Sequence, residues 1–189
     1  MSKFAASLAI ATALLSASTV AETAKPTVVL VHGAFADSSS WNGVTRILQK
    51  DGYNVVAAAN PLRSVSTDAA YVSSVVNNIK GPVVLVGHSY GGQVITNAAR
   101  ETKNVKSLVY VAAFAPDAGE AAAELAGKFP GSTLGEALAA PVKLADGNVD
   151  LSIEQSKFHQ QFAHDVSAEN AALMAAGQRP VTEAALTEK

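Results

Sequence analysis

An apolar run that leads into a serine between two glycines is the feature that most constrains this fold. Residues 82–86 are Pro-Val-Val-Leu-Val, and the pattern Gly-x-Ser-x-Gly follows at once, centred on Ser89. The β-branched run predicts a buried strand, and the helix-compatible segment 93–99 comes directly after the glycines. Gly87 and Gly91 lack the Cβ atoms that would collide in so sharp a connection. The pattern therefore predicts a strained strand–turn–helix unit that projects the Ser89 hydroxyl beside the N–H groups of a helix N-terminus.

A serine held in this way is a candidate nucleophile. The strand before Ser89 and the helix after it supply the context in which the pattern carries chemical meaning. The alternative is an ordinary glycine–serine loop that happens to join a strand to a helix.

Length and composition limit the class of protein. The chain has 189 residues, a net charge of −2 and no cysteine. It is long enough for one hydrophobic core, and its charge offers no basic surface for nucleic acid. The lack of cysteine excludes disulfide scaffolds, thiolate nucleophiles and cysteine-based zinc sites.

The first 21 residues have the pattern of a secretory signal peptide. Lys3 precedes an apolar, alanine-rich run over 4–15, and small residues lead to Ala21. The run is too short for a permanent membrane span, and cleavage after Ala21 fits the small residues there. We therefore expect a periplasmic or secreted protein without a membrane partner after cleavage. A buried or frayed N-terminal helix is the alternative.

Residues 27–116 alternate between strand and helix patterns. The strands are apolar on both faces, which is typical of a parallel sheet covered by helices on both sides. The expected strands are 27–31, 53–59, 82–86 and 107–113, and the expected helices fall within 38–51, 67–81 and 93–99. The fold class is therefore α/β, and these residues form its core.

Residues 117–189 break the alternation and predict a lid that is mainly helical. The expected elements are two helical pieces on either side of residue 130, a hairpin with an Asp-Gly turn and two further helices, within 119–140, 142–151, 156–166 and 168–176. An insertion after a parallel strand is expected above the carboxyl ends of the strands, over the site.

Four segments resemble one protein family in their order and spacing. They are 28–35, 40–41, 84–92 and 109–116. Together they resemble the α/β-hydrolase superfamily, most closely the small esterases grouped with plant methylesterases and hydroxynitrile lyases, and their bacterial relatives. The resemblance implies the α/β-hydrolase fold, with a mostly parallel sheet, helices on both faces and a helical lid. It also implies a small-molecule ester substrate and no metal or organic cofactor.

The resemblance assigns roles within the site. It implies that Ser89 attacks a carboxylic ester and forms an acyl-enzyme, while two backbone N–H groups form the oxyanion hole. One N–H group belongs to Tyr90, and the other to Ala34 or Phe35 in the loop after the first strand. Preorganised donors of this kind stabilise the developing negative charge by roughly 3–4 kcal/mol each.

The base that such a serine needs is not evident. In this superfamily the chain order is Ser, Asp, His, and the acid and base follow the lid. We expect the His88 side chain to point away from the direction of attack by Ser89, and His32 to pack or form a hydrogen bond near the loop. His159 and His164 are expected on the lid helix, at its surface. No histidine follows His164. Asp117 is a candidate acid, because some members of the superfamily place theirs just after the corresponding strand.

We therefore expect a serine hydrolase that is C-terminally truncated and lacks the last strands and the catalytic histidine. Loss of those strands would leave the fourth strand as an apolar sheet edge, through which the chain could form oligomers. Two alternatives stay open. One is an inactive remnant or binding module, and the other is a hydroxynitrile-lyase-like enzyme on the same scaffold.

Overall fold

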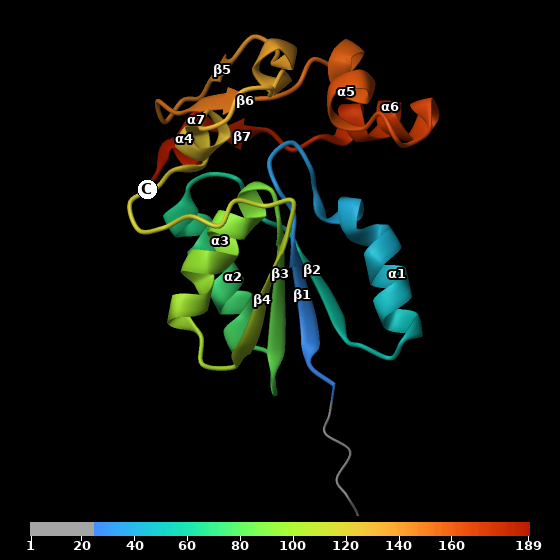
Figure 1. Cartoon of the computed structure of the whole chain (residues 1–189), viewed down its shortest axis with the longest axis vertical. Coiled ribbons are helices and arrows are strands. Elements are labelled where there is room, and N and C mark those ends of the chain that lie inside the picture. The colour runs from blue at the N-terminus through green and yellow to red at the C-terminus, as the bar shows by residue number, and fades with distance from the viewer. Residues whose placement is uncertain (1–24) are drawn as a thin grey trace, which may run out of the picture.

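The centre of the fold is a parallel four-stranded sheet with the order β2-β1-β3-β4. The computed structural model describes residues 25–189, so the predicted signal peptide lies outside the described residues. The strands are β1 Thr27–Val31, β2 Val55–Ala58, β3 Val83–His88 and β4 Val105–Val111. The α/β prediction is confirmed, although the fourth strand begins two residues earlier than expected (Figure 1).

Helices cover both faces of the sheet because alternate residues of β1 face opposite cores. Val29 and Val31 belong to a large buried cluster with α2 and α3, whereas Val28 and Leu30 pack in a smaller one with Trp41 and α1. The helices are α1 Asn42–Lys50, preceded by the 3₁₀ turn η1 Ser38–Trp41, α2 Val65–Asn77, and α3 Tyr90–Ala98, extended by η2 Ala99–Glu101. A strand apolar on both faces thus requires the two helical layers that the sequence predicts.

We call residues 117–189 the lid, and they lie above the carboxyl ends of the strands (Figure 1). The lid contains the predicted hairpin, turning at Asp146-Gly147, together with four helices and a third strand. Its elements are α4 Ala122–Ala126, η3 Leu134–Ala137, β5 Val142–Lys143, β6 Val149–Leu151, α5 Gln155–Phe162, α6 Ala168–Gly177, β7 Val181–Thr182 and α7 Glu183–Thr187.

The third lid strand corrects the prediction that only a hairpin follows the fourth strand. β7 pairs antiparallel with β6 and completes a separate three-stranded sheet in the order β5-β6-β7. Two residues are too few to produce a strand periodicity in the sequence. The pairing of Leu151 with Val181 joins residues far apart in the sequence, so no local sequence pattern predicts it.

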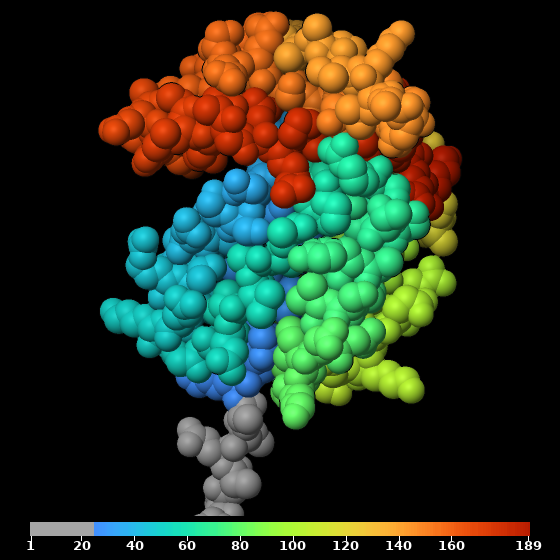
Figure 2. All heavy atoms as spheres, turned by 180° about the vertical axis from the view of Figure 1, so that it is seen from behind, coloured from blue at the N-terminus to red at the C-terminus, as the bar shows by residue number. Residues whose placement is uncertain are grey.

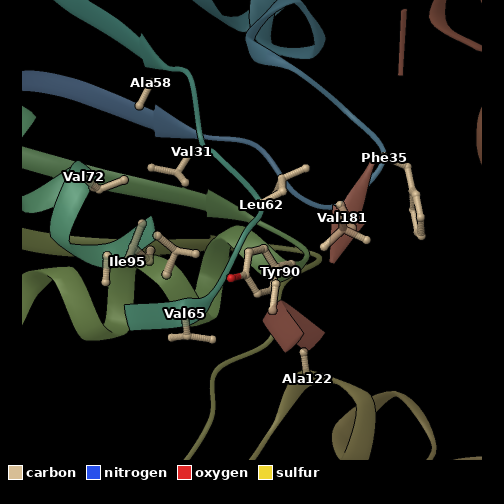
Figure 3. Close-up of a cluster of buried hydrophobic side chains, with 14 of the residues drawn as sticks. Val31, Phe35, Ala58, Leu62, Val65, Val72, Tyr90, Ile95, Ala122 and Val181 are labelled. Carbon is tan, nitrogen blue, oxygen red and sulfur yellow. The ribbon is translucent and has the colours of Figure 1, made fainter. Parts of the chain in front are cut away.

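The lid and the core share one continuous hydrophobic cluster. Ala122 and Val181 of the lid are buried in the same cluster as Leu62, Tyr90 and Ile95 of the core (Figure 3). Apolar side chains that share one core hold the two layers in a fixed relation.

β4 lies at one edge of the sheet and leaves apolar side chains exposed. Val109 is 41% exposed and Val111 is 42% exposed. Within residues 25–189, β4 pairs only with β3. In the same part of the chain no helix is long and apolar enough to cross a bilayer.

Candidate active site

Ser89 sits on the sharp connection between β3 and α3, as the glycine pattern predicts. Its backbone has φ 52° and ψ −125°, a conformation that side-chain-bearing residues rarely adopt. A Cβ on Gly87 would lie 2.6 Å from the Gly91 carbonyl oxygen, and a Cβ on Gly91 would lie 2.4 Å from that of Val31. Both glycines are therefore required for the close approach of the turn to β1 and to its own helix.

Backbone strain gathers at one edge of the sheet. Four residues other than glycine have positive φ within the described part of the chain, and each follows a different strand of the core: Phe35, Leu62, Ser89 and Ala112. These residues lie beyond the carboxyl ends of the four strands, which is where α/β folds place their ligand sites. Strain concentrated in this way is typical of a functional edge.

The loop after β1 packs directly against Ser89. A Cβ on Gly33 would lie 2.7 Å from the Ser89 Cβ and 3.2 Å from its Oγ. Ala34 and Phe35 follow and are both buried. The absence of a side chain on Gly33 thus allows the loop that carries Ala34 and Phe35 to pack closely against Ser89.

Tyr90 supplies the second candidate donor. It is the first residue of α3, so its backbone N–H has no acceptor within the helix. The Ser89 carbonyl oxygen accepts hydrogen bonds from Gly92 N at 3.0 Å and from Phe114 N at 3.1 Å. These two bonds fix the peptide that carries the Tyr90 N–H. A helix N-terminus beside a serine is a suitable place for a developing oxyanion.

A buried carboxylate that no sequence motif marks holds the side chain of Tyr90. The Tyr90 hydroxyl donates a hydrogen bond of 2.9 Å to Asp68 Oδ2, and both residues are 0% exposed. Burial raises the pKa of the Asp68 carboxyl, while hydrogen bonds from Arg63 and Tyr90 act in the opposite direction. In the sequence, Asp68 is recognisable only as an aspartate in the first turn of a predicted helix. An aspartate in that position commonly stabilises the helix itself, so it does not indicate a site residue.

The two histidines nearest the turn at Ser89 are His32, which is buried, and His88, which is half-buried. The His32 Nδ1 lies 3.0 Å from the Gly33 carbonyl oxygen, and burial lowers the pKa of its imidazole. His88 stacks edge-on against Trp41, and burial lowers the pKa of its imidazole too. The location of His32 agrees with the packing and hydrogen bonding near the loop that the sequence predicts. Neither ring has a hydrogen bond to Ser89.

The lid histidines and Asp117 have no hydrogen bond to Ser89 in residues 25–189. The His159 Nε2 is 3.0 Å from the Val166 carbonyl oxygen, and His164 is exposed in the turn after α5, not on the helix itself. Asp117 is exposed in the loop after β4, where its backbone N–H donates to Glu120 at 2.9 Å. No hydrogen bond in residues 25–189 joins Asp117 to a histidine. Those residues also contain no group of three metal-ligating side chains.

A groove of about 780 Å³ opens between the lid and the core beside the loop after β1. Phe35 and Arg46 line it from the core, and Phe158, Leu173 and Met174 line it from the lid. Figure 2 shows it as a hollow between the overhanging red-orange lid residues and the blue core residues below. Its lid wall is mainly apolar but includes Asn170 and Gln178, and its core wall mixes apolar and polar groups.

Comparisons with known proteins place this chain among the alpha/beta hydrolases. A model of the alpha/beta hydrolase family matches residues 28–188. A carbendazim-hydrolysing esterase from Nocardioides sp. (strain SG-4G) is 32% identical over 105 residues, which are 49% of this chain and 43% of that protein. The chain thus spans less than half the length of this curated relative.

Solved structures share the fold at low sequence identity. An extracellular α/β-hydrolase from a Paenibacillus species superposes with a TM-score of 0.70 at 24% identity, covering 87% of this chain and 70% of that one. Polyneuridine aldehyde esterase gives a TM-score of 0.70 at 15% identity, over 87% and 74%. A pyrethroid hydrolase from Sphingobium faniae gives 0.66 at 19% identity, over 85% and 70%. With the family match over nearly all described residues, these findings establish that the chain belongs to the alpha/beta hydrolase family.

Proposed function

We propose that this protein is a serine hydrolase that acts on carboxylic esters through an acyl-enzyme at Ser89. The observation that carries the proposal is the contact between Gly33 and Ser89. It supports a site in which the backbone N–H of Ala34 or Phe35, in the loop after β1, and that of Tyr90, at the start of α3, stabilise the oxyanion formed by attack of Ser89. Esterases among the relatives support the same reaction class.

The proposed reaction has two halves. The Ser89 Oγ attacks the ester carbonyl carbon and loses its proton, and the carbonyl oxygen becomes an oxyanion. The backbone N–H of Tyr90, with that of Ala34 or Phe35, stabilises this charge before the alcohol leaves with a proton. Water then attacks the acyl group, releases the acid and restores the serine.

A second candidate function is binding without turnover. None of the four histidines hydrogen-bonds to Ser89 within residues 25–189, and a serine without an adjacent base is a weak nucleophile. This observation favours a non-catalytic binding protein. Asp117 remains the proposed acid, with no histidine bonded to it in the described residues.

The groove suggests the kind of ester. Phe158, Leu173 and Met174 form an apolar wall next to Phe35, which immediately follows the proposed oxyanion donor Ala34. An apolar acyl or alcohol group would bury surface there, at about 25 cal/mol per Å² of apolar area. One relative is named for carbendazim hydrolysis, and one protein of similar fold is named as a pyrethroid hydrolase.

Turnover of para-nitrophenyl butyrate tests the proposal. Wild-type protein should release nitrophenolate in a saturable manner, and Ser89→Ala should abolish that release. Ser74→Ala, which changes an exposed serine of α2, serves as the matched control. Folded wild-type protein that binds the ester without cleaving it would support the binding function instead.

We also propose that the protein is exported and loses its first 21 residues. The support is the charged, apolar and small-residue pattern of this segment. The mass of the protein recovered from a periplasmic extract or culture medium tests it. A mature chain that begins at Glu22 is expected, and an intact N-terminus in the cytoplasm would contradict export.

A further inference from the structure

The two ends of Tyr90 face different surroundings. Its backbone N–H lies at the N-terminus of α3 beside Ser89, whereas its phenol is buried and donates to Asp68 Oδ2 at 2.9 Å. A tyrosine side chain has only two principal torsions, so a hydrogen bond at its tip also restrains its backbone. The phenol therefore acts as an anchor for the peptide that carries the proposed oxyanion donor.

The surroundings of Asp68 hold its carboxylate in place as the acceptor for the Tyr90 hydroxyl. The Arg63 backbone N–H donates to both of its carboxylate oxygens, at 3.1 and 3.2 Å. Asp68 also lies in the first turn of α2, where the helix dipole favours a negative charge. This fully buried carboxylate accepts from two donors, the Arg63 N–H and the Tyr90 hydroxyl, and losing either donor would leave its burial less well compensated.

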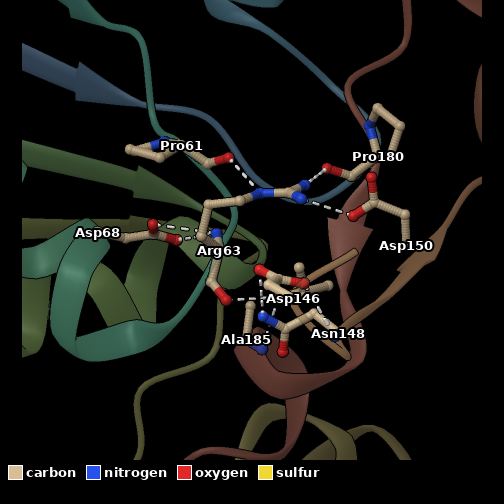
Figure 4. A network of polar contacts seen from close by, with 9 residues as sticks. Pro61, Arg63, Asp68, Asp146, Asn148, Asp150, Pro180 and Ala185 are labelled. Carbon is tan, nitrogen blue, oxygen red and sulfur yellow. Dashed lines mark hydrogen bonds and ion pairs between the residues drawn. The ribbon is translucent and has the colours of Figure 1, made fainter. Parts of the chain in front are cut away.

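Arg63, whose backbone N–H binds Asp68, also binds the lid. The Arg63 guanidinium donates to Asp150 Oδ1 at 2.6 Å and to the Pro180 carbonyl oxygen at 2.5 Å (Figure 4). In return, Thr182 Oγ1 donates to the Arg63 carbonyl oxygen at 2.5 Å. Hydrogen bonds therefore run without interruption from lid strands β6 and β7 through Arg63 and Asp68 to Tyr90.

We propose that Asp68 is a positioning residue of the active site. It holds the Tyr90 phenol, and through it the Tyr90 backbone N–H, at the oxyanion position, while Arg63 keeps the lid in register with that position. This inference rests on the proposed ester hydrolysis at Ser89. It concerns geometry before the substrate arrives, so it can also be measured without turnover.

Kinetics of Tyr90→Phe and Asp68→Ala provide the first test. Because an oxyanion donor acts in the transition state, both variants should lower kcat about tenfold and leave KM within about twofold. Asp68→Asn keeps an oxygen that accepts from Tyr90, so it should regain most of the kcat lost in Asp68→Ala. Tyr71→Phe is the matched control, since Tyr71 is an exposed tyrosine of α2, and it should change neither constant.

Amide hydrogen exchange provides the second test and needs no turnover. The N–H groups of Gly92 and Phe114 both donate to the Ser89 carbonyl oxygen and so report the geometry of the turn. In Tyr90→Phe and Asp68→Ala they should exchange about fivefold faster or more, and in Tyr71→Phe at the wild-type rate.

The outcomes separate the two proposals. Wild-type protein without Ser89-dependent turnover would overturn ester hydrolysis, and the exchange rates would then decide the role of Asp68 alone. Folded Tyr90→Phe with unchanged kcat or with unchanged exchange at Gly92 and Phe114 would overturn the positioning role. A lower melting temperature with unchanged kcat would assign the Asp68–Tyr90 pair to stability only.

Discussion

Ser89 occupies the space next to Gly33 in which any other residue would carry its side chain. A Cβ at position 33 would lie 2.7 Å from the Ser89 Cβ and 2.9 Å from the His88 carbonyl oxygen. The loop after β1 and the turn after β3 therefore fit together only when residue 33 has no side chain. This contact joins the two halves of the candidate site.

Gly33→Ala should separate those halves. The methyl group would meet backbone as well as side-chain atoms, so the loop must move away from Ser89, at a cost of about 1–3 kcal/mol. Ser89-dependent ester hydrolysis should fall more than tenfold, as is typical for loss of an oxyanion donor. Urea unfolding and para-nitrophenyl butyrate kinetics measure the two effects.

Gly43→Ala is the matched control for that substitution. Gly43 lies in α1, and a Cβ there would meet nothing within 4 Å. Alanine in a helix should stabilise the protein by about 0.5–1 kcal/mol, and although Gly43 lines the groove, the added methyl group meets no atom that must move, so Ser89-dependent turnover should stay within about twofold. If Gly33→Ala behaved like Gly43→Ala, the loop would not be a working part of the site.

His32 should make the protein less stable in mild acid. Burial lowers the pKa of its imidazole in the folded state, so the unfolded chain takes up this proton first, near the ordinary pKa of about 6.5. The contribution of the neutral His32 imidazole to the free energy of unfolding is fully present above that pH. It is lost as pH falls toward the lowered folded pKa, with a slope of up to about 1.4 kcal/mol per pH unit.

Urea unfolding of wild-type protein and His32→Gln between neutral pH and mild acid checks this. The variant should show a flatter pH dependence, whatever its absolute stability. His164→Gln, which alters an exposed histidine, should follow the wild-type curve. An equal slope in wild type and His32→Gln would contradict a neutral, buried imidazole.

Arg63→Met should loosen the lid. The substitution removes the hydrogen bonds to Asp150 and the Pro180 carbonyl oxygen and leaves a partly buried carboxylate unpaired, at a cost of about 1–3 kcal/mol. The Thr182 amide, which donates to the Leu62 carbonyl oxygen at 3.0 Å, should exchange faster. Lys128→Met breaks an exposed ion pair with Glu120 and should cost less than about 1 kcal/mol.

The exposed edge at β4 should cause self-association. Val109 and Val111 are exposed there, and within residues 25–189 only one side of β4 is paired, so its other side offers backbone groups to a second copy. Sedimentation velocity should show oligomers that increase with concentration, and Val109→Lys should abolish them. Ile47→Lys places the same charge on α1, where the residue is 62% exposed, and should have little effect. A wild-type monomer at all concentrations would exclude pairing through this edge.

Local patterns in the sequence predict the core well. The strand–turn–helix unit at Ser89 follows from two glycines, and the two-layered helical cover follows from strands that are apolar on both faces. The partner of Tyr90 was not predictable, because Asp68 lies 22 residues earlier and meets it only after α2 packs on α3. β7 is not predictable for the same reason, since its two residues become a strand only by pairing with β6.

Covalent labelling tests the central claim most directly, which is that Ser89 is a reactive nucleophile. Folded wild-type protein and Ser89→Ala are each incubated with a fluorophosphonate, and intact mass and peptide mapping locate the adduct. The account predicts one adduct on wild type, on the peptide that contains Ser89, and none on Ser89→Ala. A folded wild-type protein that takes up no label, or an equal adduct on Ser89→Ala, would contradict it.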